Sequence, residues 1–194
     1  MPGYPSLPEK AVPGDLGPVL VCCLGIGRGR PKHPVLCVPS ATFKLMVTVR
    51  LAAPGEAAAL CAIAREAYQR YVPRIGREPA PMSADYAAAV RDGQAWVAVG
   101  RGQVIGFVVL IAQPDHLLLE NLAVRPSWQG RGVGSRLLAL AEDVAGRLRL
   151  AEVRLYTNEA MTENLAYYPR RGYAETHRAE QDGFRRVFFS KRLT

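Results

Sequence analysis

The sequence has few of the residues that would support a metal centre, a disulfide-stabilised fold or a membrane span. Its 194 residues include four cysteines and three histidines, and no two cysteines have CxxC spacing. No apolar run approaches the roughly 18 residues that a membrane-spanning helix needs. We therefore expect no metal, no membrane association, and reduced thiols in a cytoplasmic protein.

Charge and hydrophobic content narrow the class of protein further. Hydrophobic residues make up 49% of the chain, which is enough for an ordinary globular core. The 25 lysines and arginines outnumber the 17 acidic residues. This excess suits an anionic ligand but does not indicate nucleic acid, and we expect no nucleic-acid partner. Association of a basic N-terminal tail with nucleic acid stays an open alternative.

The chain divides into two parts of different composition. Residues 1–44 contain eight of the 15 prolines together with six glycines, so they cannot sustain helices or strand ladders. We interpret residues 1–44 as a flexible N-terminal extension and residues 45–194 as one folded domain.

From residue 45 onward, apolar residues alternate or recur at helical spacing. Expected strands are 45–50, 95–101, 104–111, 116–124 and 152–157, followed by a closing hairpin of 173–178 and 184–193. Expected helices cover 60–71, a short segment capped by Ser83, 133–149 and 159–170. The strand–helix–strand order from 116 to 157 predicts two parallel neighbouring strands, and the domain is therefore of the α/β class.

A glycine-rich loop joins the strand at 116–124 to the helix at 133–149. Gly130, Gly132 and Gly134 alternate with other residues, which lets the backbone approach a ligand and align its N–H groups. These N–H groups lie at the N-terminus of a helix, where the helix dipole adds partial positive charge, so the loop can bind a phosphate. A Walker loop is disfavoured because the loop lacks lysine, and a dinucleotide fingerprint is disfavoured because the pattern is GxGxG in mid-chain.

Two motifs in order resemble the GNAT N-acetyltransferase superfamily. The first is Gln129-Gly130-Arg131-Gly132-Val133-Gly134, preceded by the strand at 118–124. The second runs from Asn164 through Tyr167 and Tyr168 to Gly172-Tyr173. The resemblance covers about residues 46–192 and implies a mixed, strongly twisted central sheet with flanking helices. It also implies that two parallel strands, 117–124 and 153–157, splay apart to admit acetyl-CoA.

The resemblance further implies which residues hold acetyl-CoA, the cosubstrate. Backbone groups of Leu122 and Val124 would pair with its pantetheine arm, and Asn164 would help to hold it. Its pyrophosphate would rest on backbone N–H groups of the loop, formed by Gln129, Gly130, Arg131, Gly132, Val133, Gly134 and Ser135.

The implied reaction is direct attack of a neutral amine on the thioester carbonyl. Tyr168 matches the tyrosine that protonates the departing thiolate, whereas packing in a helix is the plain structural alternative. The adjacent Tyr167 points elsewhere on the helix, and we expect it to be core. A backbone N–H near Leu122 would stabilise the oxyanion.

Glu120 is the candidate base. It is expected to share a strand face with Leu118, Leu122 and Val124, where an apolar setting would raise its pKa. An ion pair with Arg154 is the equal alternative, and His116 is a further candidate base.

The acceptor pocket is expected between residues 53 and 91. Tyr68 and Tyr71 could form an aromatic wall, or could simply pack their helix, and Asp85 could pair with an ammonium group. Arg74 and Arg77 suggest an acceptor with a carboxylate or phosphate.

The leading hypothesis is acetyl transfer to a primary amine of a small molecule. A non-catalytic coenzyme A sensor, a partner-binding module, acetylation of a protein or peptide amine, and a homodimer formed through the C-terminal hairpin all stay open.

Overall fold

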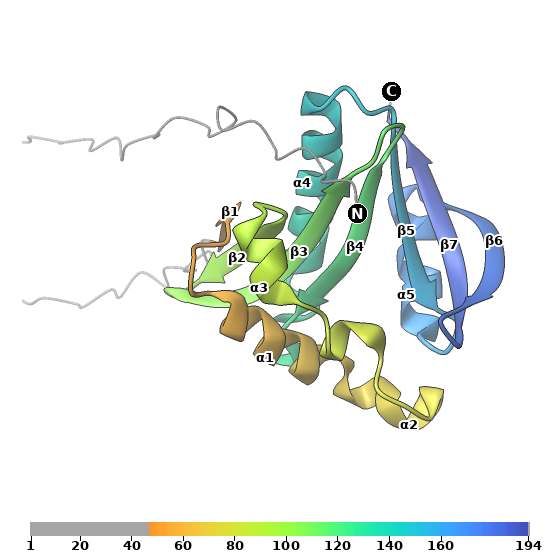
Figure 1. The fold of residues 1–194 in the computed structure, drawn as a ribbon, viewed down its shortest axis with the longest axis horizontal. Helices are drawn as coiled ribbons and strands as arrows, with labels where there is room; N and C mark the ends of the chain where they lie inside the picture. The colour runs from red at the N-terminus through yellow and green to blue at the C-terminus, as the bar shows by residue number, and fades with distance from the viewer. Residues whose placement is uncertain (1–46, 194) are drawn as a thin grey trace, which may run out of the picture. The chain divides into compact units, whose positions relative to one another are not determined.

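The computed structural model describes residues 47–193, and the expected flexible extension at 1–44 lies outside these residues. Seven strands form one sheet in the order β1-β2-β3-β4-β5-β7-β6, with helices on both faces (Figure 1). The strands are β1 (Val47–Leu51), β2 (Ala95–Gly100), β3 (Gln103–Ala112), β4 (Leu117–Val124), β5 (Glu152–Asn158), β6 (Ala174–Gln181) and β7 (Phe184–Arg192). The α-helices are α1 (Ala57–Tyr68), α2 (Val72–Ile75), α3 (Tyr86–Arg91), α4 (Val133–Arg147) and α5 (Thr162–Tyr167).

The sheet is mixed, as the sequence predicts. All neighbouring strands are antiparallel except β4 and β5, which are parallel and are connected through α4. Their pairing is short: it begins at Leu117 with Val153 and ends at Leu119 with Leu155. Beyond this point the two strands diverge, as Figure 1 shows. The expected splay between the parallel strands is therefore confirmed.

A β-bulge in β4 lies where the splay begins. Val109 of β3 pairs with Asn121 and the next residue, Leu110, pairs with Leu119, so Glu120 is an extra residue with no partner in β3. A bulge bends its strand and resets which face each side chain occupies. Since the bulge directly follows the last β4–β5 pair, it turns β4 away from β5.

The bulge also corrects our expectation about the neighbours of Glu120. Leu119 and Val124 both belong to the core beneath α4, although they are five positions apart. Strict alternation would have placed them on opposite faces. Glu120 therefore does not share a face with Leu122 and Val124, and the prediction that it does is wrong.

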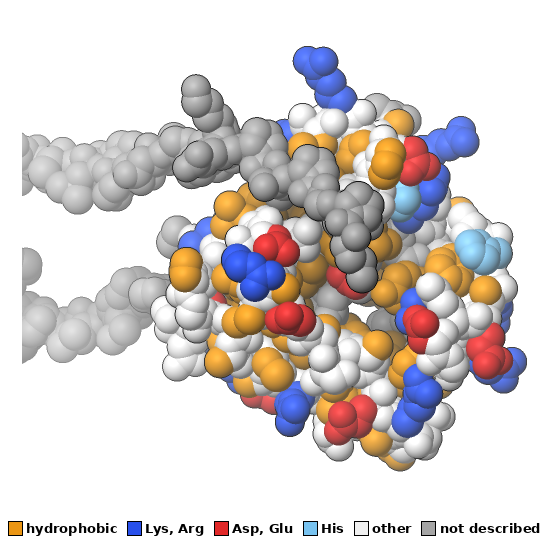
Figure 2. Space-filling model, viewed as in Figure 1, with side chains coloured by type: hydrophobic (Ala, Val, Ile, Leu, Met, Phe, Trp, Pro, Cys, Tyr) orange, Lys and Arg blue, Asp and Glu red, His pale blue; other side chains and the backbone are white. Residues whose placement is uncertain are grey.

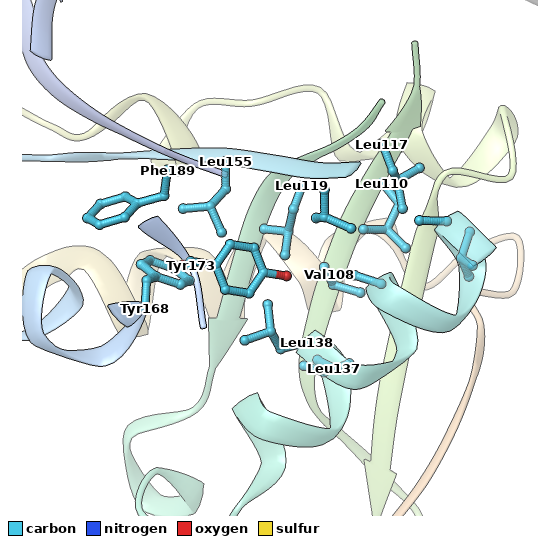
Figure 3. Close-up of a cluster of buried hydrophobic side chains, with 14 of the residues drawn as sticks. Val108, Leu110, Leu117, Leu119, Leu137, Leu138, Leu155, Tyr168, Tyr173 and Phe189 are labelled. Carbon is cyan, nitrogen blue, oxygen red and sulfur yellow. The ribbon is translucent and has the colours of Figure 1, made fainter. Parts of the chain in front are cut away.

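Two apolar cores cover the two faces of the sheet. The spacing of Leu60, Ile63, Ala64 and Ala67 gives α1 one buried stripe, which packs with α3 on Phe107 and Val109 of β3. The intervening β3 residues, Val108 and Leu110, face the opposite side and meet Leu137 and Leu138 of α4. Figure 3 shows this second core, in which Tyr168 and Tyr173 lie beside Leu155 and Phe189.

Three helices differ from the sequence prediction, which contains no helix at the position of α2. The short helix α3 is capped by Asp85, whose carboxylate accepts from Ala88 N–H at 2.9 Å, so capping by Ser83 is wrong. The helix expected at 159–170 is shorter at both ends: α5 begins at Thr162, and it ends before Pro169, which has no N–H to extend it. A 3₁₀ turn at Pro169–Arg171 follows it and ends at Gly172, whose φ is 84°.

The surface mixes both signs of charge. On the face shown in Figure 2, Lys and Arg side chains alternate with Asp and Glu side chains. Every residue of β6, the strand at the sheet edge, is exposed. Within residues 47–193, no helix combines the length and apolarity that a bilayer crossing requires.

Candidate active site

Two hollows meet where β4 and β5 diverge. The first, the glycine-loop hollow, lies between the glycine-rich loop, β4 and α5, and Gly130, Gly132, Gly134 and Ser135 line it. The second, the Glu120 hollow, lies between β4, β5, β7 and the segment after α2, and Glu120, Tyr156 and Arg186 line it. Four residues border both hollows: Tyr68, Leu122, Asn164 and Tyr168.

The glycine loop has the geometry of an anion cradle. Gly130 and Gly132 have φ values of 73° and 82°, which L-residues adopt only with strain. Arg136 is the first residue whose N–H bonds back into the loop, to Gly132 O at 3.1 Å. Within the described chain, the N–H groups of residues 130–135 make no backbone hydrogen bond. They stand at the positive end of α4, where an anion would be stabilised.

The individual loop residues contribute differently. Gln129 donates its N–H to Pro126 O at 3.3 Å and its side-chain amide to Val124 O at 2.9 Å, so it braces the loop. The Val133 side chain is core, at 1% exposure, and Arg131 lies over the Trp128 ring at 5.5 Å. Neither Val133 nor Arg131 lines the hollow.

The free edge of β4 exposes N–H groups more than carbonyls. Ala123 pairs with Phe107, and Arg125 N–H bonds Ile105 O, so the backbone groups of Leu122 and Val124 point away from β3 toward the gap. Val124 O already accepts from Gln129, and Tyr68 Oη, 3.1 Å from Leu122 O, shares its single proton between Leu122 O and Asn121 Oδ1. The N–H groups of Leu122 and Val124 are left facing the gap.

Tyr168 lies at the junction of the two hollows. Its ring is buried against Tyr167, Tyr173 and Phe189 at centroid distances of 5.4, 6.0 and 5.6 Å. Burial raises the pKa of Tyr168 well above its ordinary value, so the phenol holds its proton at neutral pH. Nearby, Asn164 Nδ2 donates to Thr157 Oγ1 at 2.9 Å, which ties α5 to β5.

Tyr167 packs against the core, as the sequence suggests, but the structure gives it a second position as well. Its hydroxyl is buried, has no hydrogen-bond partner among the described residues, and lies 3.3 Å from where a Cβ on Gly134 would stand. The residue lines the glycine-loop hollow, and the Arg171 guanidinium lies 4.9 Å from its ring centre. The sequence carries no signal for this placement, which depends on how α5 packs against the start of α4.

The Glu120 hollow combines a carboxylate with a guanidinium. Loss of hydration raises the pKa of Glu120, and the positive charge of Arg186 partly opposes that shift. Arg154 instead pairs with Glu152 at 2.6 Å and with Asp115 at 3.1 Å, so the expected alternative of a Glu120–Arg154 pair is wrong.

The candidate acceptor tyrosines occupy different positions. Tyr68 forms the wall between the hollows, where its hydroxyl also donates to Asn121 Oδ1 at 2.8 Å. Burial raises the pKa of Tyr68 well above its ordinary value. Tyr71 lines the glycine-loop hollow rather than the Glu120 hollow, and its hydroxyl accepts from Arg70 at 2.7 Å. Asp85, besides capping α3, lines a neighbouring hollow that Glu120 also lines.

The other candidates are engaged elsewhere. Arg74 pairs with Glu163 at 3.0 Å, while Arg77 stacks on the Phe184 ring at 3.6 Å. His116 lies outside both hollows, with Nδ1 2.7 Å from Asp115. Among residues 47–193, no three or more His, Cys, Asp or Glu side chains come together as metal ligands.

Comparison with known proteins places this fold and site in a family. A family model described as "Acetyltransferase (GNAT) family" matches residues 58–173. The chain is 32% identical over 88 residues to the aminoalkylphosphonate N-acetyltransferase of Salmonella typhimurium, covering 42% of this chain and 56% of that protein. It is 28% identical over 135 residues to the spore coat polysaccharide biosynthesis protein SpsD of Bacillus subtilis, covering 59% and 47% respectively.

The chain thus spans about half the length of the curated relatives it matches. Among solved structures, the PaiA N-acetyltransferase of Thermoplasma acidophilum in complex with coenzyme A has the same fold. Its TM-score is 0.67 at 20% identity, with 77% of this chain and 100% of that chain covered. On the match over residues 58–173, the chain belongs to the GNAT acetyltransferase family.

Proposed function

We propose that this chain is an acetyl-CoA-dependent N-acetyltransferase that acts on a primary amine of a small molecule. The observation that carries the proposal is the meeting of the two hollows at Leu122, Asn164 and Tyr168. A donor bound in the glycine-loop hollow and an amine bound in the Glu120 hollow would come together at these residues. The relative from Salmonella, named as an N-acetyltransferase of aminoalkylphosphonates, supports a small acceptor.

The glycine-loop hollow fits an acyl carrier with a diphosphate. The unbonded N–H groups of residues 130–135 would hold phosphate oxygens, and the N–H groups of Leu122 and Val124 would hold amide carbonyls. Bound acetyl-CoA supplies the acetyl group as an activated thioester.

Glu120 would take the proton from the acceptor ammonium. A carboxylate at its ordinary pKa is a weak base at neutral pH, whereas a raised pKa brings it closer to the working pH. Its exposure at the mouth of the hollow leaves a path for the proton to reach solvent.

Two further steps, stabilisation of the oxyanion and protonation of the leaving thiolate, would depend on Leu122 and Tyr168. Leu122 directs its N–H into the gap, where a developing oxyanion would be stabilised. Tyr168 holds its proton at Oη beside both hollows and would give that proton to the leaving thiolate. Because the surroundings that raise the phenol pKa also disfavour a thiolate anion, the two remain matched for proton transfer.

The test is release of coenzyme A thiol across a panel of amines. Tyr168→Phe should lower kcat by roughly 10²- to 10⁴-fold, the usual contribution of a general acid, and leave the Kd for acetyl-CoA within about threefold. Tyr173→Phe is the matched control, because Tyr173 is equally buried but donates to Glu142 at 3.3 Å, away from both hollows.

Two other results would change the proposal. Binding of acetyl-CoA without thiol release from any amine would instead favour a non-catalytic coenzyme A sensor. Equal kcat in the wild type and Tyr168→Phe would remove Tyr168 from the mechanism.

A further inference from the structure

A buried arginine reaches the Glu120 hollow from β7. The side chain of Arg186 is 10% exposed, and its guanidinium lies 4.3 Å from the ring centre of Tyr156, in a cation–π contact. Nη1 donates to Gln181 at 2.9 Å and Nη2 to Asp182 at 3.0 Å. In the described part of the chain, Nε donates to no protein acceptor. The guanidinium is therefore oriented in advance and has donor capacity left.

Glu120 and Arg186 line the same hollow without pairing. Their charges influence each other, yet they form no ion pair within residues 47–193, so more than 4.0 Å separates their charged atoms. Two opposite charges held apart in one hollow complement a ligand that carries both signs. An amine alone would leave the remaining donor capacity of the arginine without an acceptor.

The neighbouring turn shows what Arg186 binds. Its one ionic partner in the described chain is Asp182, whose side chain is 70% exposed. Arg77 donates to Asp182 O at 2.7 Å and so braces this turn against the segment after α2. An ion pair with so exposed a carboxylate contributes little, so an anionic ligand can compete with Asp182.

Building on the acetyltransferase function proposed above, we propose that the acceptor is a primary amine that also carries an anionic group, a carboxylate or a phosphonate. Arg186 binds the anionic group, and Glu120 lies beside the amine. This assigns to Arg186 the role that the sequence suggested for Arg74 and Arg77, which are engaged elsewhere. Acceptors of this kind are small zwitterions.

The experiment compares matched amines in the thiol-release assay. Glycine, β-alanine and 4-aminobutyrate are each set against the corresponding amide, and 2-aminoethylphosphonate against propylamine and spermidine. At one spacer length or more, kcat/KM for the anionic amine should exceed that for its neutral partner by about tenfold, since hydrogen bonds to charged groups are worth roughly 10- to 100-fold.

Variants connect this preference to Arg186. Arg186→Gln should lower kcat/KM for the preferred anionic amine by roughly 10- to 100-fold and change that for propylamine less than threefold. Arg185→Gln is the matched control, because Arg185 is the next residue, is 74% exposed and pairs with Glu159 at 3.0 Å. Asp182→Asn should act in the opposite direction, lowering KM for the anionic amine several-fold, because it removes the competing charge. Asn also tolerates the φ of 54° found at position 182.

The outcomes separate this inference from the function on which it rests. Acetylation of neutral amines or spermidine with no preference for an anionic group at any spacer length overturns the inference and leaves the acetyltransferase proposal standing. Failure of every amine to release thiol overturns the acetyltransferase proposal itself. If Arg186→Gln does not fold, Asp182→Asn decides, and an unchanged KM in that variant overturns the role of Arg186.

Discussion

Gly132 provides the sharpest test of the phosphate cradle, because a second glycine matches its backbone. Gly132, which precedes α4, has φ 82° and ψ 1°, and Gly76, which ends α2, has φ 83° and ψ 0°. A Cβ at either position would meet no atom within 4 Å. Replacing either residue with alanine therefore imposes the same left-handed strain, and only the first change lies in the glycine-loop hollow.

The magnitudes follow from this geometry. Each alanine should destabilise the fold by about 1–2 kcal/mol, the usual penalty of an L-residue in the left-handed region. At roughly 2–4 °C per kcal/mol, both variants should melt a few degrees lower than the wild type. Strain at position 132 also moves the adjacent N–H groups, so Gly132→Ala should weaken coenzyme A binding at least about tenfold, or about 1.4 kcal/mol.

Calorimetry and thermal melting measure the two effects separately. At coenzyme A equal to 100 times the wild-type Kd, the ligand should stabilise the wild type and Gly76→Ala by about 2.7 kcal/mol. A tenfold weaker Kd reduces this to about 1.4 kcal/mol in Gly132→Ala. Equal affinities in the two variants would refute the reasoning, because they would mean that the loop N–H groups do not hold the ligand.

Three more changes test other parts of the molecule. Glu120→Gln should remove the rise of kcat/KM with pH. Folding raises the pKa of Glu120, so the wild-type carboxylate destabilises the fold when it ionises at higher pH. The melting temperature of the variant relative to wild type should therefore increase from pH 4 to pH 7. Tyr167→Phe should raise the apo melting temperature slightly, because it removes a buried hydroxyl that has no partner in the described chain; a lower melting temperature would show that the hydroxyl is hydrogen-bonded. Gly106→Ala should destabilise the fold by more than about 2 kcal/mol in urea unfolding, because its Cβ would stand 2.9 Å from Ala123 O; near-wild-type stability would show that β3 and β4 can separate locally.

Local patterns in the sequence were sufficient for most of the fold. Alternation and turn residues predicted the bounds of the described strands to within about two residues, except that β6 continues three residues beyond its expected end, and the glycine spacing predicted the loop before α4. These features depend on neighbours along the chain, where glycine and apolar periodicity leave a direct mark. The start of α5 could not be predicted in this way. The helix begins at Thr162, after a turn in which the Asn158 side chain accepts from Ala160 N–H, and apolar periodicity does not mark this turn.

The residues that shape the candidate site depend instead on long-range register. The extra residue at Glu120 exists only relative to β3, and nothing in the alternation of β4 marks it. Arg186 lies in a strand whose register with β5 places it opposite Asn158, beside the Glu120 hollow. Helical geometry separates Tyr167 from Tyr168 and so predicts only a core position for Tyr167. The position of α4 instead brings both tyrosines to the glycine-loop hollow.

The gap between β4 and β5 raises a physical problem, because an unpaired strand edge inside a sheet invites pairing with another strand. Two side chains of the same chain remove half of that capacity: Tyr68 binds Leu122 O and Gln129 binds Val124 O. A foreign strand needs both donors and acceptors along the edge, whereas a ligand that presents only carbonyls can use the N–H groups that are left. The bulge at Glu120 lies where the gap begins, and we expect these two hydrogen bonds to disfavour pairing with a β-strand more than binding of a ligand. Removing the Gln129 amide should therefore raise the tendency to aggregate as well as loosen the glycine loop.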